Sequence, residues 1–352
     1  MIRTGWHPTL GAIVDPDRTT FSVWAPAATI VDLMIDTGQS PDASRPMVRG
    51  AEGHFSVVCE RLEPGTRYRY RLDGCGSFPD PAGRFQPDGV HGPSMTVDPS
   101  TFAWTDGDWA GIALSDLVIY ELHIGTFSPA GTFLGAADQL EALRDLGITA
   151  IELMPVADFP GSRNWGYDGV SLFAPTRCYG TPDELRRLID RAHALGLAVL
   201  LDVVYNHFGP EGNYLSLYAP QFFNAAHRTP WGAAINFDGD HSRTVRDFFI
   251  HNALYWIEEY RFDGLRMDAI HAIADDSPTH IVSEIAQALA QGPGRERHVH
   301  IVLENDANSA RLLARADPPR ATAQWNDDAH HAFHLLLTGE SDGYYRDYAD
   351  RP

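Results

Sequence analysis

The first hundred residues alternate apolar and polar positions over short stretches, and this pattern predicts strands rather than helices. Four runs rich in β-branched and aromatic residues are separated by Gly, Pro and Asp, and none of them repeats at helical spacing. The runs cover residues 20–24, 30–35, 54–59 and 66–72. Short strands with such breaks are typical of a small β-sandwich, which we expect to occupy residues 1–100.

A Pro- and Gly-rich passage at residues 78–99 ends this pattern, and from about residue 115 apolar strands alternate with amphipathic helices. Such alternation indicates parallel βαβ units. The best-marked helix begins with a capping box at Thr181 and Glu184. We therefore expect a linker at residues 101–114 and a second domain at 115–352. The expected strands are residues 117–124, 150–156, 198–205, 264–269, 300–303 and 321–325, and the expected helices lie near 135–146, from 183, near 242–260 and near 278–291.

Charge and composition exclude several classes of function. Acidic residues outnumber basic ones by 47 to 27, which gives a net charge of −20, so DNA or RNA is not an expected partner. Every basic residue is an arginine. This excludes lysine Schiff bases, lysine nucleophiles and the lysine of phosphate-binding loops.

The cysteines and the length of the apolar stretches indicate where in the cell the protein is expected. Cys59, Cys75 and Cys178 are isolated and odd in number, and no Cys-x-x-Cys pair suggests a zinc or redox site. No stretch approaches the roughly 20 apolar residues of a membrane span, and residues 1–10 lack the layout of a signal peptide. We therefore expect a cytoplasmic protein without a membrane partner.

Polar side chains follow three of the predicted strands at the point where each strand ends. The clusters are Asp202 with Asn206 and His207, Arg266 with Asp268 and His271, and Glu304 with Asn305 and Asp306. Because the carboxyl ends of parallel strands meet at one edge of a sheet, their loops project side chains into one shared mouth. We expect the active site at this edge.

Two of these acids have the surroundings of a catalytic pair. Arg266 and Asp268 are two residues apart, so on a strand both point to one face, where the guanidinium can keep the carboxylate ionised. Glu304 follows the apolar run 301–303, and desolvation there can raise its pKa and keep it protonated. An ionised nucleophile beside a protonated acid suits glycoside hydrolysis.

Other roles for the same residues stay open at this point. An Arg-x-Asp on a strand is often only a structural ion pair, and a Glu after an apolar strand is often a neighbour of a helix N-cap. Trp165 and Tyr167 either belong to the core or stack on a sugar from their Gly-rich loop.

A divalent-metal hydrolase on the same fold is a different class of enzyme to consider. Against it, the first strand of the second domain carries Glu121 and His123 rather than two histidines, and no His-x-x-x-His pair has a neighbouring Glu. The ligands of such a site would be Asp202, His207, Asp268, His271 and Glu304.

Three segments carry a resemblance to a known family. DVVYNH (202–207), GLRMDAIHA (264–272) and LEND (303–306) occur in this order on successive predicted strands and resemble the α-amylase superfamily of glycoside hydrolases. FSVWAP (21–26) is similar to the amino-terminal sandwich of branching and debranching relatives. The resemblance implies an α/β fold in which an immunoglobulin-like β-sandwich, a module of glycan-binding type, precedes a (β/α)₈ TIM barrel.

The resemblance also implies roles for individual residues. It makes Asp268 the nucleophile and Glu304 the general acid and base, and it makes Arg266 the residue that orients the nucleophile. The residues expected to contact the substrate around this pair are Trp165, Tyr167, Asp202, Asn206, His207, Arg266 and His271.

Longer segments narrow the resemblance within the superfamily. DVVYNHFGPEGNYL (202–215), TPWGAAINFDG (229–239) and QWNDDAHHAFH (324–334) are similar to members that release trehalose from malto-oligosyltrehalose. The implied reaction hydrolyses the α-1,4 bond next to the terminal trehalose with retention of configuration, without metal or cofactor.

The implied partners are the malto-oligosyltrehalose substrate and malto-oligosyltrehalose synthase. Branching or debranching enzymes and general α-glucan hydrolases are the alternatives. The residues expected at the trehalose end are Trp325, Asp327 and Asp328.

One feature of the superfamily is not found in the pattern. Its members use a third catalytic carboxylate, an aspartate after the seventh barrel strand, whereas six strands are predicted here. We therefore expect a barrel truncated after about six strands, whose unpaired edges make this chain unstable or inactive. An inactive glucan-binding fragment is accordingly a further alternative.

Overall fold

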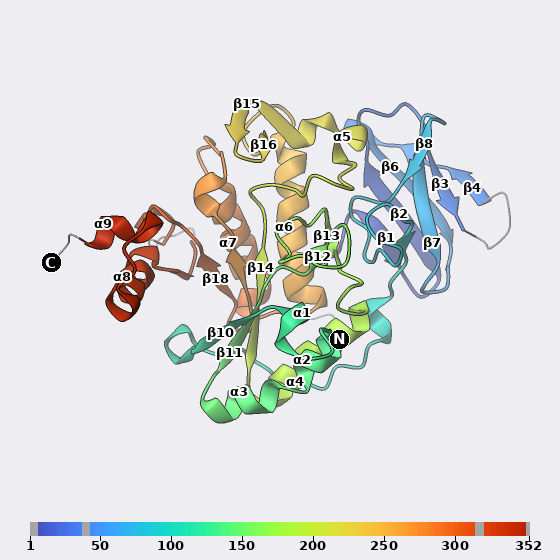
Figure 1. The fold of residues 1–352 in the computed structure, drawn as a ribbon. Coiled ribbons are helices and arrows are strands. Elements are labelled where there is room, and N and C mark those ends of the chain that lie inside the picture. Colours follow the sequence, from blue (N-terminus) through green and yellow to red (C-terminus); the bar gives the residue numbers. More distant parts are fainter. Residues whose placement is uncertain (1–5, 37–42, 314–319, 350–352) are drawn as a thin grey trace.

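The computed structural model describes residues 6–36, 43–313 and 320–349, and it contains a β-sandwich lying beside a parallel sheet with helices (Figure 1). The sandwich lies at one side of the parallel sheet, and the last helices of the chain lie at the other side. None of the described helices is long and apolar enough to cross a bilayer.

The sandwich consists of two antiparallel sheets. The first has the order β1 (Gly11–Val14), β2 (Arg18–Trp24), β6 (His54–Glu60), β5 (Val48–Arg49), and the second has the order β4 (Ala43–Pro46), β3 (Val31–Ile35), β7 (Arg67–Leu72), β8 (Gly76–Phe78), with β9 (Ser94–Met95) on β7. Alternate residues of β7 face the core, where Tyr68 packs edge-on against Phe21 of the other sheet with ring centroids 4.8 Å apart.

The four predicted strand runs of this region are confirmed as β2, β3, β6 and β7. The remaining strands were not predicted. They are two to four residues long, and β4 is exposed at every position, so no alternation of apolar and polar residues marks it.

Six parallel strands form the central sheet, in the order of the chain. They are β10 (Ile119–Leu122), β11 (Ala150–Leu153), β14 (Ala198–Val203), β17 (Gly264–Met267), β18 (His300–Leu303) and β19 (Ala323–Gln324). The predicted parallel α/β sheet of six strands is thereby confirmed. Within the described residues β10 and β19 each pair with one strand.

Helices lie between the strands of this sheet, and two more, α8 and α9, follow its last strand. The helices are α1 (Ile124–Phe127), α2 (Phe133–Ala137), α3 (Leu140–Leu146), α4 (Pro182–Ala194), α5 (Leu215–Tyr218), α6 (Ser242–Glu259), α7 (Ile281–Gln291), α8 (Asp327–Thr338) and α9 (Arg346–Ala349). The predicted capping box of α4 is confirmed, because Glu184 N–H donates to Thr181 Oγ1 and Thr181 N–H donates to Glu184 Oε2.

The structure differs from the prediction for this part of the chain in three respects. The helix expected near 135–146 is two helices, α2 and α3. The strand expected at 198–205 ends at Val203, so its polar end lies in the following loop. Two antiparallel pairs were missed, and they are β12 (Ala157–Asp158) with β13 (Ser171–Pro175) and β15 (Phe223–Thr229) with β16 (Gly232–Ile235).

A glycine allows two strands to approach closely at the start of β17. A Cβ atom on Gly264 would lie 2.6 Å from the carbonyl oxygen of His300 on β18, closer than real Cβ contacts. The position thus favours glycine and sets the spacing of β17 and β18 next to the residues that end these strands.

A buried hydrogen-bond network lies just before β17, at the amino end of the sheet. Asp263 Oδ2 lies 2.9 Å from His193 Nε2 and accepts from Val199 N–H, while Oδ1 accepts from Trp109 Nε1–H at 2.7 Å and from Arg297 Nη1–H at 3.0 Å. Burial acts to raise the pKa of Asp263, but these donors outweigh it and the pKa is lowered. The carboxylate joins the linker residue Trp109 to the sheet.

We predict that Asp263→Asn lowers the free energy of unfolding by about 3 to 5 kcal/mol. The amide NH₂ group of the new side chain would face the N–H groups that now donate to the carboxylate, and the site is buried. Urea unfolding followed by circular dichroism measures this loss. Asp116→Asn, at an exposed carboxylate between Trp109 and β10, is the control and should change stability by less than about 0.5 kcal/mol. Equal losses in both variants would contradict the structural role of Asp263.

Candidate active site

One arginine connects three strand ends at the carboxyl edge of the central sheet. Arg266 on β17 pairs in register with Asp202 on β14, and its Nη1–H donates to Asp202 Oδ2 at 2.8 Å. The same Nη1 donates to Asp268 Oδ1 at 2.9 Å, and Nη2 lies 3.1 Å from Glu304 Oε2. The side chain of Arg266 is only 8% exposed. The three acids predicted to share this edge are therefore gathered around one guanidinium.

Asp202 is the most deeply buried of the three acids. Burial raises its pKa to about 7, with a further rise from the Asp268 charge, although Arg266 opposes this shift. The hydroxyl of Tyr167 donates to Asp202 Oδ2 at 3.0 Å. Asp202 is therefore close to the balance between its neutral and ionised forms at neutral pH.

Asp268 directly follows β17 and is held from two sides. Besides the bond from Arg266, Asn206 Nδ2–H donates to Asp268 Oδ2 at 2.8 Å and to its carbonyl oxygen at 2.9 Å. The Asp268 N–H donates to the carbonyl of Val203 at the end of β14. Both carboxylate oxygens thus have fixed donors, which fixes the orientation of the group.

Glu304 has a different environment from Asp268. Burial raises its pKa, and the neighbouring Asp268 adds to the rise, while Arg266 and the Ala269 N–H oppose it. The Ala269 N–H donates to Glu304 Oε2 at 2.9 Å from a left-handed backbone with φ of 41°, which is unusual for a residue with a side chain. The direction of the pKa shift favours a protonated carboxyl group.

A fourth carboxyl group, missed in the sequence, lies on β11, the strand beside β14 on the side away from β17. Glu152 on β11 has Oε1 3.9 Å from Arg266 Nε, and neither of its oxygens has a hydrogen-bond donor among the described residues. Burial raises its pKa to about 8, and the charge of Asp202 adds to the shift. The only signal in the sequence is an acid inside the short apolar strand AIEL.

An aromatic face lies beside this cluster. The His207 ring stacks on Trp231 with centroids 4.4 Å apart and an interplanar angle of 9°, and His207 Nε2 lies 3.0 Å from the carbonyl oxygen of Tyr167. Burial lowers the pKa of His207. Trp231 stands in the turn between β15 and β16 and is 52% exposed. It was not singled out in the sequence, although it lies in the segment TPWGAAINFDG.

The other expected site residues are not joined to Arg266 by contacts within the described parts of the chain. His271 Nδ1 lies 3.3 Å from Asp306 Oδ1, and Trp165 is 71% exposed. Trp325 donates its backbone N–H to Leu303. Asp327 and Asp328 form the first turn of α8 rather than a loop, and Asp328 accepts from the hydroxyl of Tyr348.

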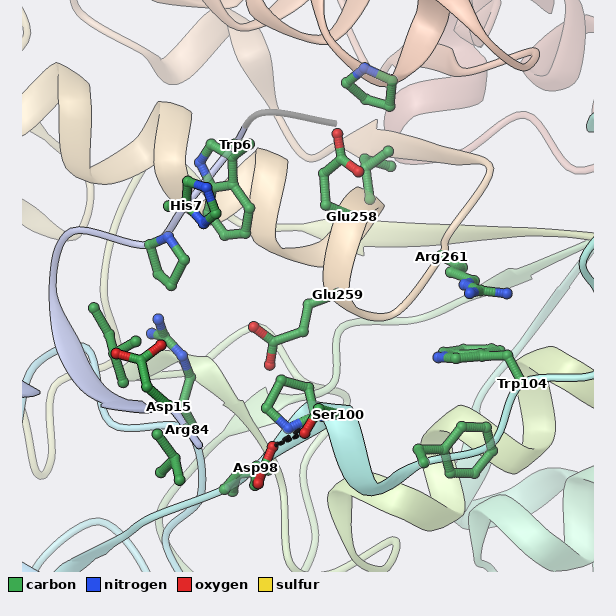
Figure 2. Close-up of a pocket in the computed structure, with 18 of the residues that line it drawn as sticks. Trp6, His7, Asp15, Arg84, Asp98, Ser100, Trp104, Glu258, Glu259 and Arg261 are labelled. Atoms are coloured by element: carbon green, nitrogen blue, oxygen red, sulfur yellow. Dashed lines mark hydrogen bonds between the residues drawn. The ribbon is translucent and has the colours of Figure 1, made fainter. Parts of the chain in front are cut away.

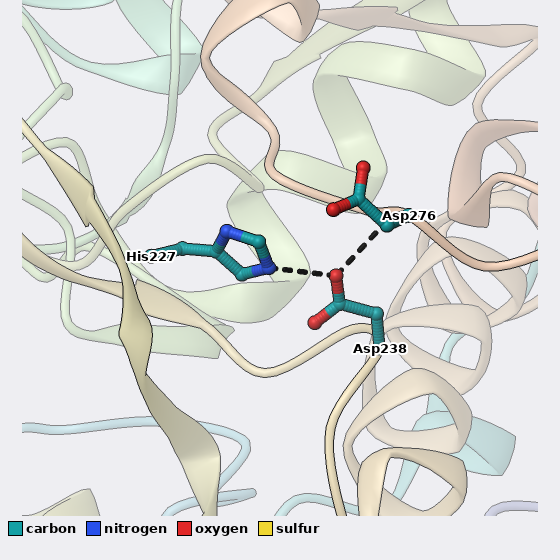
Figure 3. A group of neighbouring side chains, drawn as sticks. All are labelled: His227, Asp238 and Asp276. Carbon is teal, nitrogen blue, oxygen red and sulfur yellow. Dashed lines mark hydrogen bonds and ion pairs between the residues drawn. The ribbon is translucent and has the colours of Figure 1, made fainter.

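The residues considered for a metal site do not come together as such. Arg266 stands between Asp202, Asp268 and Glu304, and the described residues bring three metal-type side chains within 4.8 Å elsewhere, at His227, Asp238 and Asp276 (Figure 3). There Asp238 Oδ2 lies 2.8 Å from His227 Nε2 and accepts from the Asp276 N–H. These bonds link the β15–β16 hairpin and the loop after β16 to the loop after β17.

Family models match both parts of the chain. Residues 9–99 match carbohydrate-binding module 48, the isoamylase N-terminal domain, and residues 96–253 match the alpha amylase catalytic domain. Residues 96–253 belong to the α-amylase family. The sandwich lies within the first match, and strands β10, β11 and β14 of the parallel sheet lie within the second.

Individual members of the α-amylase family are similar to nearly the whole chain. Malto-oligosyltrehalose trehalohydrolases of Saccharolobus solfataricus and Deinococcus radiodurans are 45% and 48% identical over 97% and 94% of this chain, which covers 59% and 52% of their lengths. A solved structure from Salmonella typhimurium, provisionally named an alpha amylase, has a TM-score of 0.91 at 44% identity and covers 99% of this chain and 59% of that chain. The chain spans between half and three fifths of the curated relatives named here.

We predict that Glu152→Gln stabilises the protein more at pH 8 than at pH 5. Burial raises the pKa of Glu152 in the folded protein to about 8, whereas the same group in the unfolded chain ionises at a lower pH. The folded state therefore binds one more proton in this range, and the unfolding free energy of the wild type falls as the pH rises toward 8. The gap in unfolding free energy between variant and wild type should widen by up to about 1.4 kcal/mol per pH unit. Urea unfolding at both pH values measures it, with the exposed Glu63→Gln as control. A gap independent of pH would contradict the burial of a neutral Glu152.

Proposed function

We propose that this protein is a retaining glycoside hydrolase that cleaves the α-1,4 bond next to the terminal trehalose of malto-oligosyltrehalose and releases trehalose. The observation that carries the proposal is the shared guanidinium of Arg266, which holds Asp268 and Glu304 at one edge of the sheet. The names of the curated relatives support the substrate. A retaining reaction requires two nearby carboxyl groups, one that attacks and one that donates a proton.

In the proposed reaction Asp268 attacks the anomeric carbon while Glu304 gives its proton to the departing glycosidic oxygen. The C–O bond to trehalose breaks, and the remaining glucan chain is held as an ester of Asp268. Glu304, now ionised, takes a proton from water, and the resulting attack on the anomeric carbon releases the sugar and restores both carboxyl groups. Arg266 and Asn206 keep Asp268 in position during both steps.

We further propose a substrate-binding surface around this pair. Tyr167 and Asp202 are linked by a hydrogen bond, and the His207–Trp231 stack offers an aromatic face of the kind that packs on sugar rings. Trp325, Asp327 and Asp328 stay our proposal for the trehalose end. The further residues proposed to contact substrate are Trp165, Asn206, Arg266 and His271. We assign no described residue to a third catalytic carboxylate.

Several broader expectations belong to the same proposal. We propose the domain division of 1–100, 101–114 and 115–352, with the sandwich as a glycan-binding module. We also propose that no metal or cofactor takes part, that malto-oligosyltrehalose synthase supplies the substrate, and that the enzyme acts in the cytoplasm, in keeping with the unpaired Cys59, Cys75 and Cys178.

We predict that maltotriosyl-trehalose is hydrolysed at least about 100-fold more efficiently, in kcat/KM, than maltopentaose, because polar groups that bind the trehalose end lose their hydrogen-bond partners with a plain glucan end. The new reducing ends that each substrate gives are measured with this chain beside the Saccharolobus solfataricus relative. Asp268→Asn, which removes the nucleophile, should lower kcat by several orders of magnitude while substrate binding persists.

Other outcomes identify the alternatives. Equal rates on both substrates would favour a general α-glucan hydrolase, and transfer of glucan chains to new branch points would favour a branching enzyme. Binding of maltotriosyl-trehalose without any turnover by this chain would favour a glucan-binding fragment. Full activity in Asp268→Asn would contradict the assignment of the nucleophile.

A further inference from the structure

A cavity lies at the opposite end of the sheet from Arg266. It has a volume of about 470 Å³ and lies between the amino-terminal segment, the linker after β9 and the carboxyl end of α6 (Figure 2). Trp109, which donates to Asp263 just before β17, is one of its lining residues. The cavity therefore opens at the amino end of the strands whose carboxyl ends carry the candidate active site.

Two indole rings on separate segments line this cavity and are held in place. Trp6 donates its Nε1–H to His251 Nδ1 at 2.9 Å. Trp104 lies under the Arg261 guanidinium at 4.4 Å and against Phe102 with ring centroids 4.9 Å apart. Figure 2 shows Trp6 and Trp104 at different sides of the cavity, with Glu259 drawn between them. Rigid aromatic surfaces are available on two walls.

Glu259 supplies a buried acceptor to the same cavity. Its side chain is nine-tenths buried, and Oε1 accepts from Arg186 Nη2–H at 3.3 Å, whereas Oε2 has no donor among the described residues. Burial raises the pKa of Glu259, with Arg84 and Arg186 opposing the shift. Because Oε2 is not fully buried and Glu259 lines the cavity, this oxygen can accept a hydrogen bond from a ligand or water there.

Carboxylates outnumber guanidinium groups on the cavity wall, because six acids and three arginines line it. Two of these acids are paired from outside the cavity, since Arg186 Nη2–H donates to Glu259 and Arg61 Nη2–H donates to Asp98 at 3.0 Å. Arg84, which lines the cavity, directs Nη1–H and Nη2–H to the carbonyl oxygens of Ala82 and Leu10. The wall thus presents hydrogen-bond acceptors and a surplus of acids, which disfavours a phosphate or a nucleotide as the ligand.

We propose that this cavity is a non-catalytic binding site for a neutral saccharide of two or three sugar units. The volume is in the range of small-molecule sites, and aromatic walls with a few fixed polar groups suit a ligand that carries both apolar ring faces and many hydroxyl groups. A sugar hydroxyl can donate to Glu259 Oε2 from within the cavity. Binding here is independent of whether the edge at Arg266 hydrolyses a glucan.

The indole N–H signals of ¹⁵N-labelled protein test this site directly. Trp6→Phe and Trp104→Phe assign the two signals, and maltotriose and trehalose are then titrated separately. We expect both signals to shift together with at least one of the two sugars, with a Kd of about 1 mM, a strength of binding common for small ligands. The shifts should persist in Asp268→Asn, which alters only the other site.

The Glu259→Gln variant tests the proposed acceptor. Because Gln keeps the shape but replaces the charged acceptor, the Kd should rise by about 10-fold while the indole signals stay dispersed as in the folded wild type. Unmoved Trp6 and Trp104 signals at about 50-fold the expected Kd of both sugars would overturn the proposal. So would an unchanged Kd in Glu259→Gln, or shifts caused by choline, an organic cation, but not by the sugars.

Discussion

The arrangement at the carboxyl edge depends on one positive charge shared among four carboxyl groups. Arg266 contacts Asp202, Asp268 and Glu304 directly, and Glu152 lies 3.9 Å from its Nε. A single guanidinium cannot neutralise four ionised acids in a buried setting, so part of the cluster must keep protons. The raised pKa values of Glu152, Asp202 and Glu304 express this constraint. The division into ionised and neutral groups, on which the proposed chemistry depends, follows from it.

The parallel sheet explains why these groups meet. Strands β14, β17 and β18 are neighbours in both chain and space, so residues that follow them in sequence fall within reach of one side chain. Strand β17 has only four residues, with Asp263 before it and Asp268 after it. Each end of β17 therefore adjoins a polar network, one holding the linker and one forming the candidate active site. The cavity near Trp104 lies at the amino end of β17, and the proposed glycosidase site lies at its carboxyl end.

Much of the site could be predicted because polar residues after buried strands are conspicuous. Asp268 and Glu304 stand out for this reason, as does the capping box at Thr181. Glu152 could not be assigned, since one acid in a short apolar strand does not reveal which side of the sheet it faces. Trp231 lies in the turn of the β15–β16 hairpin, and His207 lies in the loop after β14. Because these are separate segments, only tertiary packing brings the two rings together. The start of α8 was detectable, because Asn326 followed by two acids is a helix-start signal.

The central claim is that Arg266 sets the protonation of the acids around it. Carbon-13 NMR titration of the side-chain carboxyl groups in the wild type and in Arg266→Met tests this claim most directly. Because Arg266 lowers the pKa of both Asp202 and Glu304, its removal should move both titrations to higher pH while the rest of the spectrum stays that of a folded protein. Unchanged titrations of Asp202 and Glu304 in the folded variant would contradict the account.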